Sequence, residues 1–211
     1  MSPQQSAMQD QDERERQMQA RQKRLAGRMA LVDNVLIVLS GKGGVGKSTV
    51  AVNLATELCR KGRKVGLLDA DMHGPSTPRM LKLDEAAVHS NGQSLLPAEH
   101  SSGLKLMSIA FLIEGRDEAV VWRGPLKMNV LRQLLADVEW GDLDYLIIDL
   151  PPGTGDEPLS ICQLLPEATG AVVVTTPQEV ALSDVRRCVN FCHQRELPVT
   201  GVVENMSGFV C

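Results

Sequence analysis

Short runs of apolar residues recur along the chain, separated by stretches whose apolar residues repeat with a helical period. In the first run, residues 34–40, apolar residues follow one another without alternation, which predicts a strand buried on both faces of a sheet. Further strands are predicted at residues 64–68, 104–108, 145–149, 171–176 and 199–205. None of these runs approaches the roughly 20 apolar residues that cross a bilayer.

Helical periodicity marks the segments between the strands. Apolar residues recur at spacings of three and four across residues 49–60, and again after Gly124-Pro125 as far as Leu135. A helix is also predicted over residues 180–194, one or two helical turns at 78–81, and a loop or small hairpin over 82–102. Strands that alternate with helices indicate an α/β domain, in which a doubly wound, mostly parallel sheet is covered by helices on both faces.

The two ends of the chain need separate treatment. Residues 1–30 are rich in Gln, Met, Arg and Glu, with a thin apolar stripe of Met18, Leu25 and Met29. A mobile tail or a loosely docked helix is expected there, followed by one domain over residues 31–211. Because a doubly wound sheet usually closes with a further helix, the sequence is expected to stop before the C-terminal part of that domain.

The overall composition argues against several classes of protein. The net charge is −4 without a long basic block in the predicted domain, and aromatic residues make up 3%, so nucleic acid is not the expected partner. The N-terminus lacks the apolar stretch of a signal peptide. A cytoplasmic protein that does not act on membranes is expected.

The segment between the first strand and the first helix carries a complete Walker A motif. Its glycines let backbone N–H groups surround phosphate oxygens, and the flanking strand and helix supply the required context. Lys47 is expected to reach the β- and γ-phosphates, and Ser48 to hold Mg²⁺ through its hydroxyl. The predicted nucleotide-binding loop consists of Gly41, Lys42, Gly43, Gly44, Val45, Gly46, Lys47, Ser48 and Thr49.

Residues at the ends of other predicted strands complete this site. Asp149 ends an apolar strand and fits the Walker B role of holding Mg²⁺ through water. Asp71 is the candidate for orienting or activating the attacking water, whereas Asp69 is interpreted as structural. Gly153 follows two prolines, so its N–H can swing toward a γ-phosphate. Asn205 offers an amide to an adenine edge, with a turn-forming role as the alternative.

The five cysteines are scattered, which does not predict a disulfide framework. Cys188 and Cys192 lie four residues apart on a predicted helix beside His193, a spacing that a metal ion can use. A helix packed against a sheet commonly carries cysteine as a small apolar residue. That second interpretation is favoured for this pair, and it extends to Cys59 and Cys162.

These motifs together resemble one branch of the P-loop ATPases. With Lys42, the loop reads Lys-Gly-Gly-Val-Gly-Lys-Ser and resembles the deviant Walker A motif of the MinD/ParA superfamily. The segments 69–76, 122–125, 149–156 and 204–209 are similar to those of the Mrp/ApbC branch, which comprises ATP-binding iron–sulfur cluster carriers. The resemblance covers residues from about 32 to 211.

The resemblance implies a P-loop NTPase fold and a homodimer that hydrolyses ATP and assembles or transfers an iron–sulfur cluster to apo-proteins. It places Lys42 against the nucleotide of the other subunit. It also places Asp71 in the first switch, Gly153 in the second, and Asn205 beside adenine.

The same resemblance implies a cluster site near the C-terminus. The family carries a Cys-x-x-Cys pair after its Met-Ser-Gly segment, and two subunits share one cluster through these pairs. Cys211 alone occupies that motif here, so a dimer offers two thiolates where a 4Fe–4S cubane uses four. The eukaryotic relatives with an extra N-terminal cluster carry cysteines in that region, and residues 1–30 contain none.

Three other functions stay open from the sequence. A MinD- or ParA-like positioning ATPase would use ATP-driven dimerisation to bind a membrane or DNA, through an amphipathic C-terminal helix or a basic surface. A reductase like the nitrogenase iron protein would need cluster cysteines at other positions in the core. The third alternative is a regulatory module with little turnover.

Overall fold

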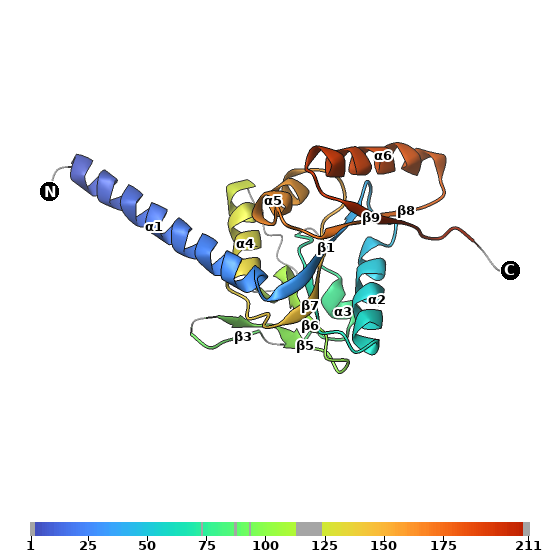
Figure 1. The fold of residues 1–211 in the computed structure, drawn as a ribbon, viewed down its shortest axis with the longest axis horizontal. Coiled ribbons are helices and arrows are strands. Elements are labelled where there is room, and N and C mark those ends of the chain that lie inside the picture. The colour runs from blue at the N-terminus through green and yellow to red at the C-terminus, as the bar shows by residue number, and fades with distance from the viewer. Residues whose placement is uncertain (1–2, 73, 87, 93, 113–123, 209–211) are drawn as a thin grey trace.

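A seven-stranded sheet forms the centre of the molecule in the computed structural model, which describes residues 3–72, 74–86, 88–92, 94–112 and 124–208 (Figure 1). The order of its strands is β5-β6-β2-β7-β1-β8-β9. They are β1 (Val32–Ser40), β2 (Val65–Asp69), β5 (Ala98–Glu99), β6 (Lys105–Ser108), β7 (Leu143–Asp149), β8 (Gly170–Thr175) and β9 (Val199–Glu204). Each neighbouring pair is parallel except β5 with β6. The mostly parallel sheet that the sequence predicts is therefore confirmed.

Strand β1 shows why its sequence is apolar at successive positions. Val35, Ile37 and Leu39 face one hydrophobic core. Leu36 and Val38, which lie between them in the sequence, face a second core on the other side of the sheet. Because neither face of the strand meets water, the alternation of apolar and polar residues disappears.

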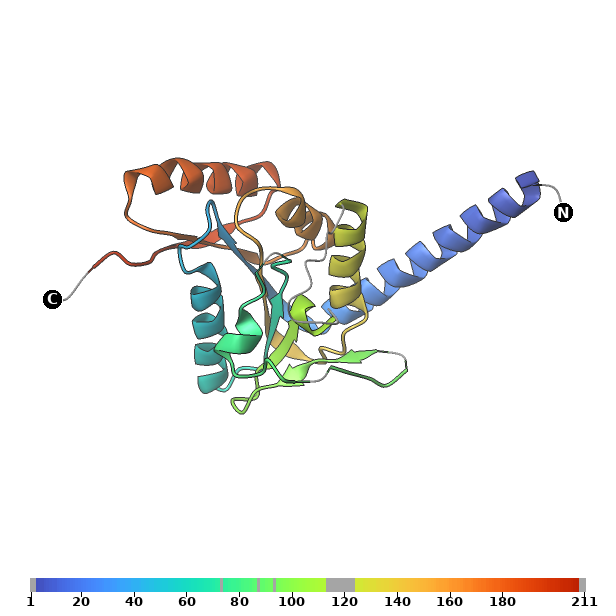
Figure 2. The same ribbon diagram turned by 180° about the vertical axis from the view of Figure 1, so that it is seen from behind.

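Helices cover both faces of this sheet (Figures 1 and 2). The core on one face includes residues of α2 (Lys47–Arg60) and the residue after α3 (Thr77–Met80). The core on the other face includes residues of α4 (Gly124–Ala136), α5 (Asp156–Leu164) and α6 (Glu179–Gln194). A 3₁₀ helix follows β6 at Ile109–Leu112, and β3 (His89–Ser90) pairs with β4 (Leu95–Leu96) as the small predicted hairpin.

The N-terminal segment forms one long helix, α1 (Pro3–Met29). Its C-terminal end packs beside α4, while its N-terminal half projects from the molecule (Figure 1). Leu25 is buried in the core, and Arg24 forms an ion pair with Asp137 at 3.3 Å. The C-terminal end of this helix is therefore docked, while the choice between a mobile tail and a loosely docked helix for residues 1–30 stays a prediction. None of the helices in the described part of the chain has both the length and the apolar character of a membrane span.

Candidate functional site

A tight loop joins β1 to α2 at the carboxyl end of the parallel strands. Strand β1 ends at Ser40, and α2 begins at Lys47. Gly44 and Gly46 have φ angles of 78° and 85°, in the left-handed region that favours glycine. These two glycines let the chain turn sharply into α2, whose first N–H groups are free to bind an anion.

The loop is held in position by α6 and by the residue after β9. An added Cβ on Gly41 would lie 2.6 Å from the carbonyl carbon of Asp184, so α6 approaches the loop as closely as only glycine allows. An added Cβ on Gly46 would overlap the side-chain nitrogen of Asn205. That nitrogen donates a hydrogen bond of 2.9 Å to the carbonyl of Val45. Tertiary contacts therefore fix the shape of the loop.

Lys47 and Asp149 form a buried ion pair at the centre of this site. Lys47 Nζ lies 2.5 Å from Asp149 Oδ1, and the two side chains are 6% and 0% exposed. The same Nζ lies 3.3 Å from the hydroxyl of Ser48. Burial raises the pKa of Asp149, while the charge and hydrogen bond of Lys47 oppose that rise.

The second carboxylate oxygen of Asp149 matters for metal binding. Asp149 Oδ2 is buried and has no hydrogen-bond partner among the residues that the structure describes. The hydroxyl of Ser48 lies close to this carboxylate, because Lys47 Nζ contacts both groups. A carboxylate and a hydroxyl are oxygen ligands of the kind that Mg²⁺ takes. The residues present therefore fit a Mg²⁺ ion.

A further buried carboxylate, that of Asp69, lies next to Asp149. The two residues are direct neighbours on the parallel strands β2 and β7. Asp69 accepts hydrogen bonds from the N–H and the hydroxyl of Thr77, at 3.1 and 2.8 Å. Burial raises the pKa of Asp69 to about 6, the charge of Asp149 adds to the rise, and the hydrogen bonds of Thr77 oppose it. These bonds tie the start of α3 to the sheet, which supports the structural interpretation of Asp69.

The two predicted switch residues lie on loops at the same edge of the sheet. The N–H of Asp71 donates to Asp69 Oδ1 at 3.2 Å, and Asp71 Oδ1 accepts from the N–H of Gly74 at 3.3 Å. Gly153 has a φ angle of 99°, and its N–H donates to the carbonyl of Ser40 at 2.7 Å. The structure therefore places Gly153 at the end of β1 and Asp71 just after the end of β2, while their roles in hydrolysis stay predictions.

Lys42 makes its contact inside the same chain. Its Nζ donates a hydrogen bond of 3.0 Å to the side-chain oxygen of Gln178, which directly precedes α6. The sequence gives no signal for this partner, because 136 positions separate the two residues. The role of Lys42 across a dimer interface stays a prediction, as does the contact of Asn205 with adenine.

A second ion pair of low exposure links α5 to α4. Lys127 Nζ lies 2.5 Å from Glu157 Oε1, and the side chains are 17% and 9% exposed. Glu157 belongs to the first turn of α5, a helix that the apolar pattern did not predict. The signal for this helix was the sequence Asp156-Glu157-Pro158, since acidic residues and proline favour a first helical turn. The ion pair itself has no local signal.

The cysteines in the described segments behave as apolar residues. Cys188 and Cys192 are completely buried, and burial raises the pKa of each thiol to about 11, so both stay protonated at neutral pH. Cys59 and Cys162 are half-buried and pack against the two cores, so the same interpretation holds for them in part. Within the described residues, no group of three or more His, Cys, Asp or Glu side chains is placed to hold a metal ion.

Five residues of the predicted motifs cannot be placed. They are His73, Trp122, Arg123, Phe209 and Cys211, which lie outside the described residues. The expected cluster ligand therefore stays a prediction from the resemblance.

Comparison with known proteins agrees with the geometry of the loop. The ParA-type family model described as "NUBPL iron-transfer P-loop NTPase" matches residues 31–211. The "Iron-sulfur cluster carrier protein" of Methanocaldococcus jannaschii is 48% identical over 183 residues, which cover 87% of this chain and 63% of that protein. The "Cytosolic Fe-S cluster assembly factor NUBP2 homolog" of Trichoplax adhaerens is 52% identical over 184 residues, which cover 85% and 69%. The chain thus spans about two thirds of the length of these relatives.

Solved structures show the same fold. The nucleotide-binding protein in complex with ADP from Archaeoglobus fulgidus matches with a TM-score of 0.79 and 41% identity, over 90% of this chain and 73% of that one. The MinC:MinD cell division complex of Aquifex aeolicus matches with a TM-score of 0.59 and 21% identity, over 80% and 68%. The second match shows the fold alone. The predicted doubly wound P-loop NTPase fold is confirmed.

Proposed function

Because the chain belongs to the NUBPL iron-transfer P-loop NTPase family, we propose that it binds and hydrolyses ATP as a homodimer and delivers an iron–sulfur cluster to apo-proteins. The names of the relatives from M. jannaschii and T. adhaerens support the cargo, and the second name supports a cytoplasmic location. The relative from A. fulgidus, which is described with ADP, supports nucleotide binding at the loop.

The buried contact between Lys47 and Asp149 carries this proposal. A buried ion pair is costly to desolvate, and each partner left without countercharge would be more costly still. The phosphates of ATP offer acceptors for Lys47. The chain therefore has a cation that exchanges one buried carboxylate for the β- and γ-phosphates, as the Walker A lysine does.

Asp149 and Ser48 would hold Mg²⁺ once Lys47 has turned to the phosphates, Ser48 through its hydroxyl and Asp149 through water. Bound Mg²⁺ supplies positive charge that stabilises the developing charge on the phosphate oxygens. The buried Oδ2 atom of Asp149, which lacks a hydrogen-bond partner in the described part of the chain, supports this assignment.

The two switch loops would respond to the γ-phosphate. Asp71 orients or activates the attacking water from the loop after β2. The N–H of Gly153 breaks its hydrogen bond with the carbonyl of Ser40 and donates to the γ-phosphate instead. Because Ser40 directly precedes the nucleotide loop, this exchange couples the loop after β7 to the bound nucleotide.

The homodimer would complete each site from the facing subunit. Lys42 donates an exposed hydrogen bond to the neutral side-chain oxygen of Gln178. A phosphate of the nucleotide bound to the opposite subunit is a charged and therefore stronger acceptor, so it can replace Gln178 as the partner of Lys42. Asn205 would meet adenine with its amide while its nitrogen braces the loop at Val45. The cluster is the cargo of this dimer, and Cys211 is its expected ligand.

Turnover of Mg-ATP by the Asp71→Ala variant tests the proposal. Loss of the group that orients or activates water should lower kcat by about 100-fold or more, with ATP affinity within a few-fold of wild type. Asp142→Ala, at an exposed aspartate just before β7, is the control and should leave kcat unchanged. Normal hydrolysis by Asp71→Ala would remove Asp71 from the mechanism, and a wild-type protein without turnover would contradict the ATPase.

Anaerobic reconstitution with iron and sulfide tests the cargo. A form of the chain that also carries the second cysteine of the motif should retain iron and sulfide with the visible absorbance of a cluster, and Cys211→Ser in that form should lose both. Cys59→Ser, which removes a half-buried thiol at the end of α2, is the matched control. Equal iron content in that form and in its Cys211→Ser variant would contradict the assignment of Cys211.

A further inference from the structure

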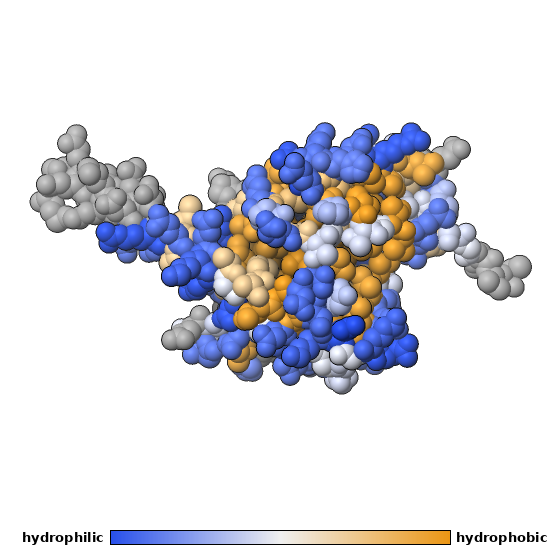
Figure 3. Space-filling view, viewed as in Figure 1, coloured by the Kyte–Doolittle hydropathy of each residue, from blue (hydrophilic) through white to orange (hydrophobic). Residues whose placement is uncertain are grey.

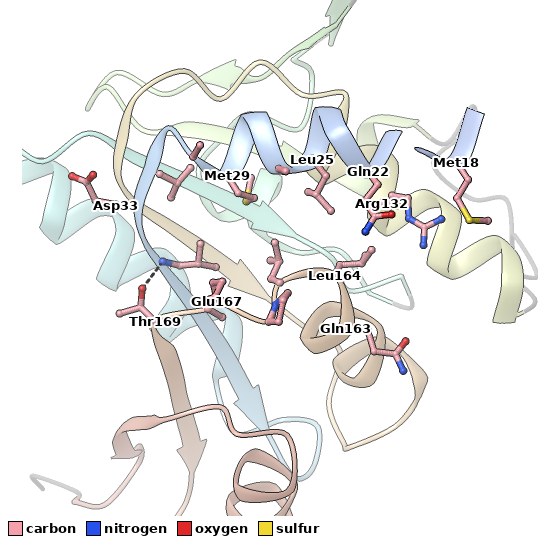
Figure 4. A pocket seen from close by; sticks show the side chains of 17 residues that line it. Met18, Gln22, Leu25, Met29, Asp33, Arg132, Gln163, Leu164, Glu167 and Thr169 are labelled. Carbon is pink, nitrogen blue, oxygen red and sulfur yellow. Dashed lines mark hydrogen bonds between the residues drawn. The ribbon is translucent and has the colours of Figure 1, made fainter. Parts of the chain in front are cut away.

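An apolar groove lies at the amino end of the parallel strands, away from the nucleotide loop. Its volume is about 690 Å³, and it runs between α1 and residues 163–169, which connect α5 to β8. Figure 4 shows Leu25 and Met29 of α1 facing Leu164 across it. Met18, at the outer end of the groove, is 58% exposed. Leu25 and Leu165 are buried and Met29 and Leu164 are half-buried, so the groove is a hollow with apolar walls, a shape that suits the binding of an apolar side of a ligand or partner.

The groove is charged differently at its two ends. Gln22 and Arg132 lie near Met18 at one end, and Asp33 and Glu167 lie toward the other (Figure 4). Arg132 makes no hydrogen bond or ion pair with the residues that the structure describes, although it is only half-exposed. Arg132 is the basic residue among those that line the groove, since Arg24 and Arg28 of α1 contact Asp137 and Ser94 instead, so the charge difference between the two ends rests on Arg132 against Asp33 and Glu167.

The dimensions fit a short helix. Met18 and Met29 are eleven residues apart on α1, a distance of about 17 Å at 1.5 Å per residue. A second helix packed along this face would contact it over about three turns. The apolar surface where α1 joins the rest of the molecule, with hydrophilic residues along α1, is visible in Figure 3.

We propose that this groove binds an amphipathic helix of a partner protein, with acidic residues at the end that meets Arg132 and basic residues at the end near Asp33 and Glu167. The apolar face of that helix would contact Met18 and Leu164, as in other helix-in-groove complexes. The complementary charges at the two ends would select the partner and fix its direction. The site is separate from nucleotide chemistry and stands or falls independently of the proposed ATPase.

Designed peptides test this site on the full chain. A labelled 14-residue helix with leucine at positions i, i+3, i+4 and i+7 carries glutamates at one end and lysines at the other. Two companions carry lysines at both ends or glutamates at both ends. Fluorescence anisotropy should show the mixed-charge peptide binding tightest, since only it matches both ends of the groove.

Substitutions in the groove sharpen the test. Arg132→Glu should lower the affinity for the mixed-charge peptide by about tenfold and should raise the affinity for the peptide with lysines at both ends. Met18→Asp should weaken all three peptides. Lys82→Glu, an equal charge change at an exposed lysine after α3, is the control and should leave binding unchanged. Circular dichroism establishes that the variants fold like the wild-type protein.

Several outcomes would overturn the proposal. One is no binding of the mixed-charge peptide, and another is an equal loss in Arg132→Glu and Lys82→Glu. Vesicles of phosphatidylserine that bind the wild-type chain more tightly than the peptide, with loss in Met18→Asp, would assign the groove to a membrane surface. Self-association in light scattering that Met18→Asp removes would assign it to a second copy of the chain.

Discussion

The carboxyl edge and the amino edge of the central sheet, where the parallel strands end and begin, differ in whether their charged residues are buried. At the carboxyl edge, Lys47, Asp69 and Asp149 are buried, and each has a hydrogen-bond or ion-pair partner. At the amino edge, the walls of the groove are apolar, and its charged residues lie at the rim. Burying charge is costly, so a fold retains it mainly where a charged ligand or reaction needs it. A rim charge costs little and serves to select a partner.

This contrast implies that the carboxyl edge is built for a small, highly charged ligand and the amino edge for a large, mostly apolar one. At the carboxyl edge, α6 and Asn205 approach the nucleotide loop so closely that its geometry is preset. At the amino edge, Met18 and Arg132 have room to adapt to an occupant. Substitutions at the two edges should therefore change the free energy of unfolding by different amounts, and these changes should depend differently on pH.

The largest expected effect comes from breaking the buried ion pair. Lys47→Met leaves Asp149 buried without its countercharge and should lower the free energy of unfolding by about 3–5 kcal/mol near pH 8. Adding Asp149→Asn removes the uncompensated carboxylate and should recover most of that loss. Urea denaturation at equilibrium measures both.

The matched control at the amino edge is Arg24→Ala. It breaks an ion pair whose arginine is 53% exposed, so the expected cost is below about 1 kcal/mol. Equal costs for Lys47→Met and Arg24→Ala would end the contrast between the two edges.

The next effect is a pH dependence that originates in Asp69. Its folded pKa of about 6 lies above the ordinary value of 3.8, so the folded protein binds more protons than the unfolded one between these values. The free energy of unfolding should therefore fall as pH rises from about 4 to 6, by up to about 3 kcal/mol from this residue alone. Unfolding of Asp69→Asn should show a shallower fall than unfolding of the wild-type protein. A fall of the same depth in Asp69→Asn would exclude Asp69 as its source.

The smallest of the three effects concerns packing of the nucleotide loop. Gly41→Ala would force the new Cβ against the backbone of Asp184 and should cost about 1–3 kcal/mol. Gly43→Ala is the control in the same loop, because its Cβ would lie 3.8 Å from Pro152, an ordinary contact. Thermal unfolding without nucleotide should separate the two variants. If both unfold at the same temperature, α6 does not brace the loop as described.

The sequence predicted the carboxyl edge well because its signals are local. The run at residues 34–40 marks a strand with two buried faces, and the spacing from Gly41 to Ser48 marks the loop that follows. The structure also places Asp149 where an acid at the end of its strand was expected, beside the loop. Local rules are sufficient there, because parallel strands bring their carboxyl ends to one edge.

Contacts between distant residues were not predictable in the same way. Gln178 meets Lys42, and Glu157 meets Lys127, through side chains that no motif connects. The stripe of Met18, Leu25 and Met29 marks the face of α1 that lines the groove, but no pattern indicates the segment more than 130 positions later against which α1 packs. The sequence left residues 1–30 between two alternatives for that reason.

Calorimetric titration of Mg-ATP into the Lys47→Met/Asp149→Asn protein tests the central claim, that the buried charges at the carboxyl edge serve the nucleotide. Because the double variant should fold nearly as stably as the wild-type protein, a change in binding reports on the ligand and not on unfolding. The account predicts clear binding to the wild-type chain and an affinity about 100-fold or more lower in the double variant, equivalent to about 3 kcal/mol. An affinity within threefold of wild type would contradict it.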